Sequence, residues 1–181
     1  MTLVVRAVTG ADTTALRITV LRDGRADALL GDDEAALHLG VYDGEQLVGT
    51  GNVRRDKAAW LPADAVAWRL RGMATDESFR GRGVGALVLD SLVEHCRNEG
   101  GTVLWCHARV PAQRFYERAG FVAFAEPWVD PEIGPHVRMQ MALAHVADCI
   151  EDRVSGTDGH VQRAPFADSG VARACATRTG S

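Results

Sequence analysis

A segment rich in glycine and arginine, residues 80–85, lies between a strand-like run that ends at Thr75 and a helix-like run that extends to Cys96. Its sequence is Arg-Gly-Arg-Gly-Val-Gly. Glycine lets the backbone approach an anion closely and adopt positive φ, and a helix that begins here directs its unpaired N–H groups toward that anion. The segment therefore predicts a phosphate-binding turn between a strand and a helix, and a plain turn with solvated arginines is the alternative.

Two other kinds of phosphate-binding loop are excluded by the residues of this segment and its surroundings. A dinucleotide-binding loop has the pattern G-x-G-x-x-G and an acidic ribose-binding residue on a following strand, and this chain lacks that combination. A Walker loop ends in Gly-Lys-Ser or Gly-Lys-Thr, which is also missing from the segment. The segment therefore belongs to neither class.

Hydrophobic periodicity and turn signals predict the elements on both sides of this segment. Apolar runs predict strands over residues 3–8, 37–42, 46–54, 67–75, 102–106, 121–124 and 136–143. Helical spacing predicts helices over residues 9–22, 84–96 and 111–119, and Asp43-Gly44 predicts a tight hairpin. A helix between two strands favours a right-handed parallel crossover. The predicted fold class is α/β (mixed α+β), with a central mixed sheet and helices on both faces.

Composition limits the number of domains and the kinds of partner. The chain has 181 residues, of which 46% are hydrophobic, so it can bury one substantial core and is expected to form one domain. A net charge of −4 gives no basic field for nucleic acid. The first residues do not resemble a signal peptide, and no apolar run reaches the roughly 20 residues that a membrane span needs. We expect a cytoplasmic protein that binds neither nucleic acid nor membrane.

The four cysteines do not form a metal-binding or disulfide pattern. Cys96, Cys106, Cys149 and Cys175 have no C-x-x-C spacing and no paired histidine motif. We therefore expect reduced thiols and no metal site.

Together, two motifs resemble the GNAT superfamily of acyl-CoA-dependent N-acetyltransferases. The first is R-x-x-G-x-G at residues 80–85, and the second is A-x-x-F-Y-x-x-x-G-F at residues 112–121. Their order, their spacing and the elements between them agree with that family over residues 3–143. The resemblance implies a GNAT domain over residues 1–147, while residues 148–181, which have no periodicity, are expected to be a disordered tail.

The resemblance also implies acetyl-CoA as the co-substrate and indicates which residues contact it. The loop amides would receive the diphosphate, and the backbone of the preceding strand would pair with the pantetheine arm as an added strand does. By residue-to-residue match these positions are Met73, Ala74, Thr75, Arg80, Gly81, Arg82, Gly83, Val84, Gly85 and Ala86.

Tyr116 matches the tyrosine that acts in many family members as the general acid beside the CoA sulfur. A phenol with an ordinary pKa of about 10 can give its proton to a departing thiolate. The alternative is that the ring only packs in the core, which is the role we expect for the adjacent Phe115.

The general base is open at this point. Many relatives have a glutamate on the strand before the loop, where this chain has Arg69 and Arg71. His107 is the first candidate, because imidazole titrates near neutral pH and because the residue ends the strand at the expected mouth of the cleft. His136 and a water chain are the other candidates. Arg109 stands where relatives often have an asparagine that contacts CoA.

The resemblance implies transfer of an acetyl group to a primary amine, by direct attack in a ternary complex. A small-molecule acceptor is favoured over a protein, and residues 31–34, Gly-Asp-Asp-Glu, could attract a cationic amine. A catalytically silent module that binds acyl-CoA is the alternative, since the strand glutamate is missing. A homodimer paired through the final strand is compatible with the sequence.

Overall fold

The computed structural model describes residues 2–22, 35–131 and 133–143. The elements are β1 (Leu3–Val8), α1 (Gly10–Leu21), β2 (Leu37–Asp43), β3 (Gln46–Arg55), β4 (Ala67–Thr75), the 3-10 turn η1 (Glu77–Phe79), α2 (Val84–Asn98), β5 (Val103–Arg109), the 3-10 turn η2 (Val110–Ala112), α3 (Gln113–Arg118), β6 (Val122–Ala123), β7 (Trp128–Asp130) and β8 (Gly134–Ala142). This order confirms the predicted succession and adds β7, which the sequence did not indicate. The predicted tail over residues 148–181 lies outside the described residues.

The strands form one mixed sheet in the order β1-β2-β3-β4-β5-β8-β6, with β7 also paired to β8. Among the described strands only the central pair, β4 and β5, is parallel, and the other neighbours are antiparallel. The β2–β3 hairpin turns at Gly44, whose φ of 60° is the left-handed geometry that the Asp-Gly pair predicts. The final strand, β8, is paired on both sides, so the free edges of the described sheet are elsewhere.

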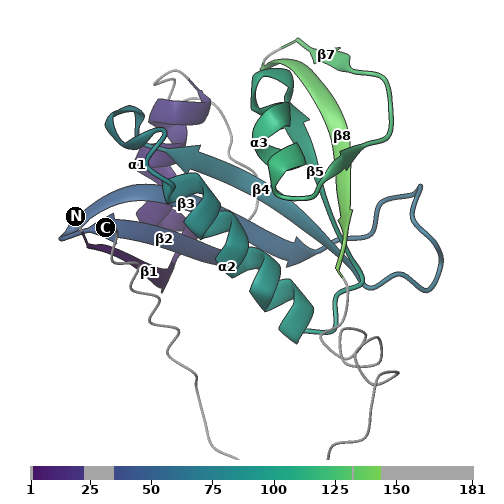
Figure 1. Cartoon of the computed structure of the whole chain (residues 1–181), viewed down its shortest axis with the longest axis horizontal. Helices are drawn as coiled ribbons and strands as arrows, with labels where there is room; N and C mark the ends of the chain where they lie inside the picture. The colour runs from purple at the N-terminus through teal and green to yellow at the C-terminus, as the bar shows by residue number, and fades with distance from the viewer. Residues whose placement is uncertain (1, 23–34, 132, 144–181) are drawn as a thin grey trace, which may run out of the picture.

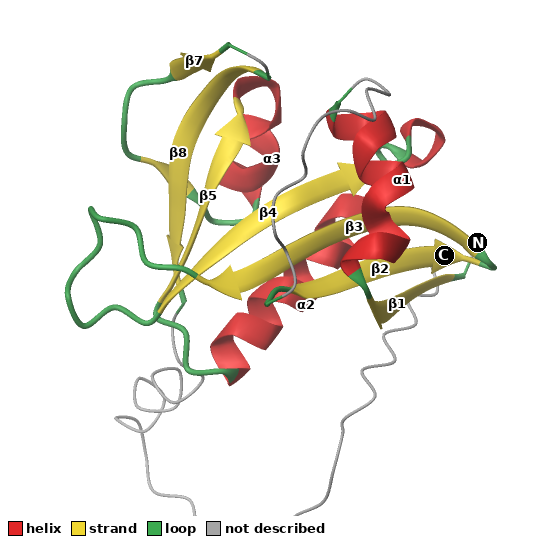
Figure 2. Ribbon diagram, turned by 180° about the vertical axis from the view of Figure 1, so that it is seen from behind, coloured by secondary structure: helices red, strands yellow, loops and turns green. Residues whose placement is uncertain are grey.

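Helices cover both faces of the sheet, as predicted (Figures 1 and 2). The apolar side of α2 is buried on one face, through Val84, Val88, Leu89, Leu92, Val93 and Cys96. Two glycines of β3 admit this helix: a Cβ on Gly49 would lie 2.3 Å from Val84 Cγ1, and one on Gly51 would lie 2.9 Å from Val88 Cγ1. Close contact between helix and strand therefore fixes the position of the N-terminus of α2.

On the opposite face, α1 packs against β3 and β4 (Figure 2). The helix starts with a capping box, in which Thr9 and Asp12 each bond the other's backbone N–H. Its buried residues are polar, Thr13 and Arg17, with Arg17 only 4% exposed. The buried face of α1 therefore carries a positive charge, that of Arg17.

The sheet opens at its centre. In the fully described strands β4 and β5, pairing covers only Ala67–Arg69 of β4 and Val103–Trp105 of β5. Beyond Arg69 the two strands diverge, and β5 continues paired to β8 through Arg109. The second half of β4 therefore presents a backbone edge that has no strand beside it.

A β-bulge in the second half of β4 accompanies this divergence. Gly72 and Met73 stand opposite the single residue Gly51 of β3. Gly72 has a φ of 63°, and a Cβ there would lie 2.8 Å from Asn52 Nδ2. Both the backbone angle and the packing require glycine at this position.

Among the described residues every helix is too short or too polar to cross a membrane.

Candidate functional site

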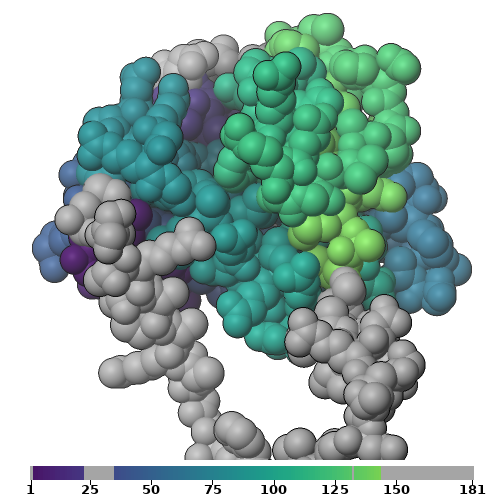
Figure 3. Space-filling model, in the orientation of Figure 1, coloured from purple at the N-terminus to yellow at the C-terminus, as the bar shows by residue number. Residues whose placement is uncertain are grey.

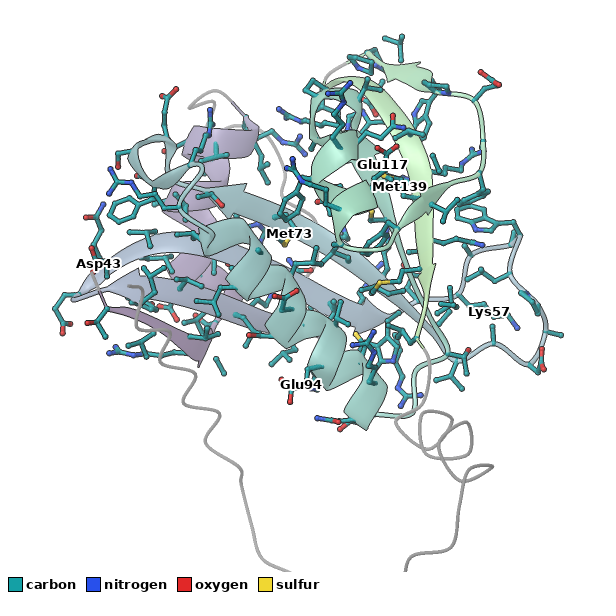
Figure 4. All side chains as sticks on the ribbon, in the orientation of Figure 1. Asp43, Lys57, Met73, Glu94, Glu117 and Met139 are labelled. Atoms are coloured by element: carbon teal, nitrogen blue, oxygen red, sulfur yellow. The ribbon has the colours of Figure 1, made fainter. Side chains whose placement is uncertain are left out.

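A cleft of about 1140 Å³ occupies the opening between β4 and β5. One end is lined by the loop before α2 and by the first turn of that helix, and the other by the end of α1 together with β7 and β8. In Figure 3 the surface is hollowed between the α2 region and α3. Figure 4 shows Met73 on β4 at the middle of the molecule, between these two parts. The cleft is large enough for an extended ligand that passes through the sheet.

The loop before α2 has the geometry expected of an anion-binding turn. Gly81 and Gly83 have φ angles of 75° and 81°, and Gly83 caps α2 without a side-chain hydrogen bond. The carbonyl of Gly83 accepts from Leu87 N, so the N–H groups of residues 83–86 have no acceptor within the helix. No acidic residue stands in this first turn, where it would compete with a bound anion.

The predicted CoA-contacting residues lie together along this part of the cleft. Met73, Ala74 and Thr75 line it from β4, and Arg80, Gly81, Gly83, Val84, Gly85 and Ala86 line it from the loop and α2. Arg82 is absent from the lining, and its guanidinium lies over the Phe79 ring at 5.3 Å. Gly85 faces both Thr75 and Phe115, so it stands between β4 and α3.

Tyr116 lies on α3 in the wall of the cleft and is only 7% exposed. Its ring centroid lies 5.0 Å from that of Phe115 and 5.5 Å from that of Phe121, both edge to face. Burial, and in second place the neighbouring Cys106, raise the pKa of the phenol far above its ordinary value. The hydroxyl is therefore protonated at neutral pH, as a proton donor must be. Phe115 packs against the core as predicted and also lines the cleft.

His107 lies on β5 at the other end of the cleft, among aromatic rings and arginines. Its ring centroid lies 4.9 Å from that of Trp128 and 5.4 Å from that of Trp105. Desolvation by the surrounding atoms, followed by the charges of Arg69 and Arg138, lowers the pKa of His107 to about 4. The imidazole is neutral at physiological pH, but it is a weak proton acceptor.

His136 on β8 is 4% exposed and also lines the cleft. Its Nδ1 lies 2.8 Å from the carbonyl oxygen of Gly134. A carbonyl only accepts, so Nδ1 carries the proton and the neutral ring keeps its lone pair on Nε2. His136 is thus brought to the same cleft as His107 and Tyr116.

Arg109 points to the opposite face of the sheet from α2. Its Nη2 donates to the carbonyl oxygen of Leu21, the last residue of α1. The sequence placed this residue only by its match to a CoA-contacting asparagine. The structure places its guanidinium at the end of α1.

The sequence did not name several residues that line this second end of the cleft. They are Arg17, Val20, Leu21 and Arg22 from α1 and its C-terminal end, and Ile133 from the segment before β8. The patterns around them are those of an ordinary amphipathic helix and a loop, so only the packing of α1 over β4 reveals their role. The acidic segment over residues 31–34 lies outside the described residues.

Two cysteines lie in the described part of the chain, and both are free and buried. Burial raises the pKa of Cys96 and of Cys106 to about 12. Cys106 lines the cleft next to Tyr116, and it does so as a neutral thiol. No group of three or more His, Cys, Asp or Glu side chains within the described ranges is arranged to hold a metal ion.

The model of the acetyltransferase (GNAT) family matches residues 11–121. An uncharacterised N-acetyltransferase of Bacillus subtilis (strain 168), YitI, is 29% identical over 143 residues, which cover 77% of this chain and 95% of that protein. A structure from Lactobacillus plantarum, named as an N-acetyltransferase, superposes with a TM-score of 0.62 at 23% identity and covers 80% of this chain and all of that one.

A structural neighbour with a bound ligand is also similar. The GNAT family acetyltransferase of Elizabethkingia anophelis, solved with acetyl-CoA bound, superposes with a TM-score of 0.54 at 14% identity, over 78% of this chain and 98% of that one. At these identities the two solved structures show that the fold is shared.

Proposed function

This chain belongs to the GNAT family, whose chemistry is acyl transfer, and we propose that it moves an acetyl group from acetyl-CoA to the primary amine of a small molecule. The observation that carries the proposal is the cleft. There an unpaired strand edge, a helix N-terminus with free N–H groups and a protonated phenol line one continuous space. A nucleotide thioester needs a partner of each kind: a hydrogen-bonding edge for its amides, an anion site for its phosphates and a proton donor near its sulfur.

The residues that would hold acetyl-CoA are those predicted from the sequence. The N–H groups of residues 83–86, with the side chain of Arg80, would bind the diphosphate. The edge of β4 from Met73 to Thr75 would pair with the pantetheine arm, as an added strand does. When bound, acetyl-CoA supplies an acyl group activated as a thioester.

In the proposed reaction Tyr116 is the general acid. A bond forms between the amine nitrogen and the acyl carbon, the bond from that carbon to sulfur breaks, and the phenol gives its proton to the departing thiolate. The amine releases one proton, and the phenolate takes one back from solvent, so the protons balance over one turnover. The raised pKa keeps Tyr116 protonated at neutral pH, and it also makes this phenol a weaker acid than a free tyrosine, so the proposed transfer depends on the placement of the hydroxyl beside the thiolate.

Direct attack by the amine is favoured over an acyl-enzyme. Among the described residues the thiol nearest to this chemistry is Cys106, and its raised pKa of about 12 leaves it protonated and a poor nucleophile. The proposal therefore needs both substrates in the cleft at once.

The amine must lose a proton, and the low pKa of His107 favours release to water over transfer to this imidazole. His136 Nε2 is the other candidate acceptor in the cleft. The cationic wall near α1 assists either route, because nearby positive charge lowers the pKa of a bound ammonium group.

Two measurements on the purified protein test the proposal. Acetyl-CoA binding is measured by calorimetry, and thiol release is followed with a panel of small amines, with the acetylated product identified by mass spectrometry. The proposal predicts acetyl-CoA binding and amine-dependent thiol release. Binding without turnover on any amine would instead favour the silent acyl-CoA-binding module. That alternative is motivated by Arg69 and Arg71, which stand where relatives often have a glutamate.

A further inference from the structure

The wall of the cleft next to α1 is unusually rich in arginine. Described residues that line it from α1 and its C-terminal end, β4 and β5 include Arg17, Arg22, Arg69, Arg71 and Arg109. From β7 and β8 the described lining adds one carboxylate, Asp130. A ligand group that enters this end of the cleft therefore meets an excess of positive charge.

Three of these arginines already take part in other interactions. Arg69 Nη1 lies 3.3 Å from Asp56 Oδ2, and its guanidinium lies 4.6 Å from the centroid of the Trp105 ring. Arg17 and Arg71 also have interactions of their own. Arg109 donates to a backbone carbonyl, but neither Arg22 nor Arg109 has a carboxylate or a ring as a partner among the described residues, so theirs are the charges that an incoming anion would complement best.

Arg22 and Arg109 are both placed at the C-terminal end of α1. Arg22 is the C-cap residue of the helix, and Arg109 donates to the carbonyl oxygen of Leu21 beside it. Nε of Arg22 is buried and has no hydrogen-bond partner among the described residues. The described carboxylates form no ion pair with either guanidinium. A buried donor without an acceptor is unfavourable, and a bound carboxylate would supply that acceptor.

We propose that the acceptor of the acyl transfer is an amino acid, whose carboxylate is bound by Arg22 and Arg109 while its amine faces the acyl group. This inference rests on the proposed function and names its substrate class. Guanidinium groups bind planar carboxylates through paired N–H donors. A diamine, by contrast, would bring a second positive charge to a wall that is already cationic.

The test compares each amino acid with the amine that lacks only its carboxylate. Suitable pairs are L-leucine with 3-methylbutylamine, L-phenylalanine with 2-phenylethylamine, and 4-aminobutyrate with propylamine. Binding to the CoA-saturated protein is measured by calorimetry, and turnover is measured separately by thiol release. We expect at least one acid to bind about tenfold more tightly than its matched amine, as the loss of a charge-assisted hydrogen bond implies.

Three variants assign the effect to the arginines. Arg22→Gln and Arg109→Gln should each remove most of the preference for the acid without changing acetyl-CoA affinity, and Arg22→Lys should retain part of it. Arg6→Gln is the matched control, because Arg6 is exposed on β1 over the Tyr42 ring and does not line the described cleft. Thermal unfolding of each variant shows whether the Arg109 bond to α1 also has a structural role.

The outcomes separate this inference from the proposed function. Tighter binding of the amine that lacks the carboxylate in every pair, or loss of acetyl-CoA affinity in both glutamine variants, overturns the carboxylate site. Turnover on amines that lack a carboxylate, without preference for acids, retains the acyltransferase and rejects the inference. Selective binding of acids without any thiol release supports the arginine site and rejects the acyltransferase.

Discussion

The two ends of the cleft are built differently. The end next to α2 consists mainly of backbone: the N–H groups of residues 83–86 and the edge of β4 from Met73 to Thr75. The end next to α1 consists of side chains from distant elements, among them Arg22, His107 and Trp128. A site made of backbone groups suits a ligand shared by a whole family, whereas a site made of side chains can differ from one chain to the next.

Tyr116 lies between these two ends, and its removal should give the largest effect. We expect Tyr116→Phe to lower kcat by about 10²–10⁴, because positioned proton transfer contributes that much. Acetyl-CoA affinity should be unchanged, because the phenol does not line the phosphate turn. Steady-state kinetics with calorimetry of acetyl-CoA binding measure both.

The only other tyrosine supplies the matched control. Tyr42 lies on β2 under Arg6 and is not part of the described cleft lining, so Tyr42→Phe should leave kcat unchanged. An undiminished kcat in Tyr116→Phe would reduce the residue to a core aromatic.

The backbone end is tested by a pair of glycines with similar geometry. Gly83 before α2 and Gly44 in the β2–β3 hairpin both have positive φ, 81° and 60°, and a Cβ on either meets nothing within 4 Å. Alanine at either position costs roughly 1–2 kcal/mol of backbone strain. Only Gly83→Ala should also weaken acetyl-CoA binding, because the strain displaces the loop amides. A loss of about 1.4 kcal/mol of binding free energy corresponds to a tenfold weaker affinity.

Chemical unfolding and calorimetry on both glycine variants make the comparison. Equal acetyl-CoA affinity in Gly83→Ala and Gly44→Ala would show that the turn before α2 does not bind the ligand.

The side-chain end makes a prediction about pH. The pKa of His107 is lowered to about 4, so this imidazole stays neutral as the pH rises from 5.5 to 8.5 and should add no limb to the rate profile. His107→Gln should therefore rescale the profile of kcat against pH without changing its shape. A limb near pH 6.5 that is present in the unaltered protein and lost in the variant would restore His107 as the general base.

Cys106 gives the smallest expected effect. Because its thiol is buried and protonated, Cys106→Ala should leave kcat unchanged and lower only the free energy of unfolding, by about 1 kcal/mol for the small cavity. Accumulation of an acetylated protein by mass spectrometry, lost in this variant, would contradict direct attack.

The same contrast explains what could be predicted from the sequence. Glycines with required φ angles and a helix with regular apolar spacing are local signals, so the Asp43-Gly44 hairpin, the turn before α2 and α2 itself were all predicted. The short strand β7 was missed because three residues, Trp128–Asp130, carry no periodicity and are ordered only by pairing with β8. The arginines at the end of α1 were missed because their place in the cleft depends on the packing of that helix over β4.

The central claim is that acetyl-CoA lies in the opening between β4 and β5. A crystal structure of the protein with CoA tests it most directly. The account predicts the diphosphate within hydrogen-bond distance of the N–H groups of residues 83–86, the pantetheine arm along Met73–Thr75, and the sulfur near the hydroxyl of Tyr116. A CoA molecule bound elsewhere, or a sulfur far from that hydroxyl, would contradict it.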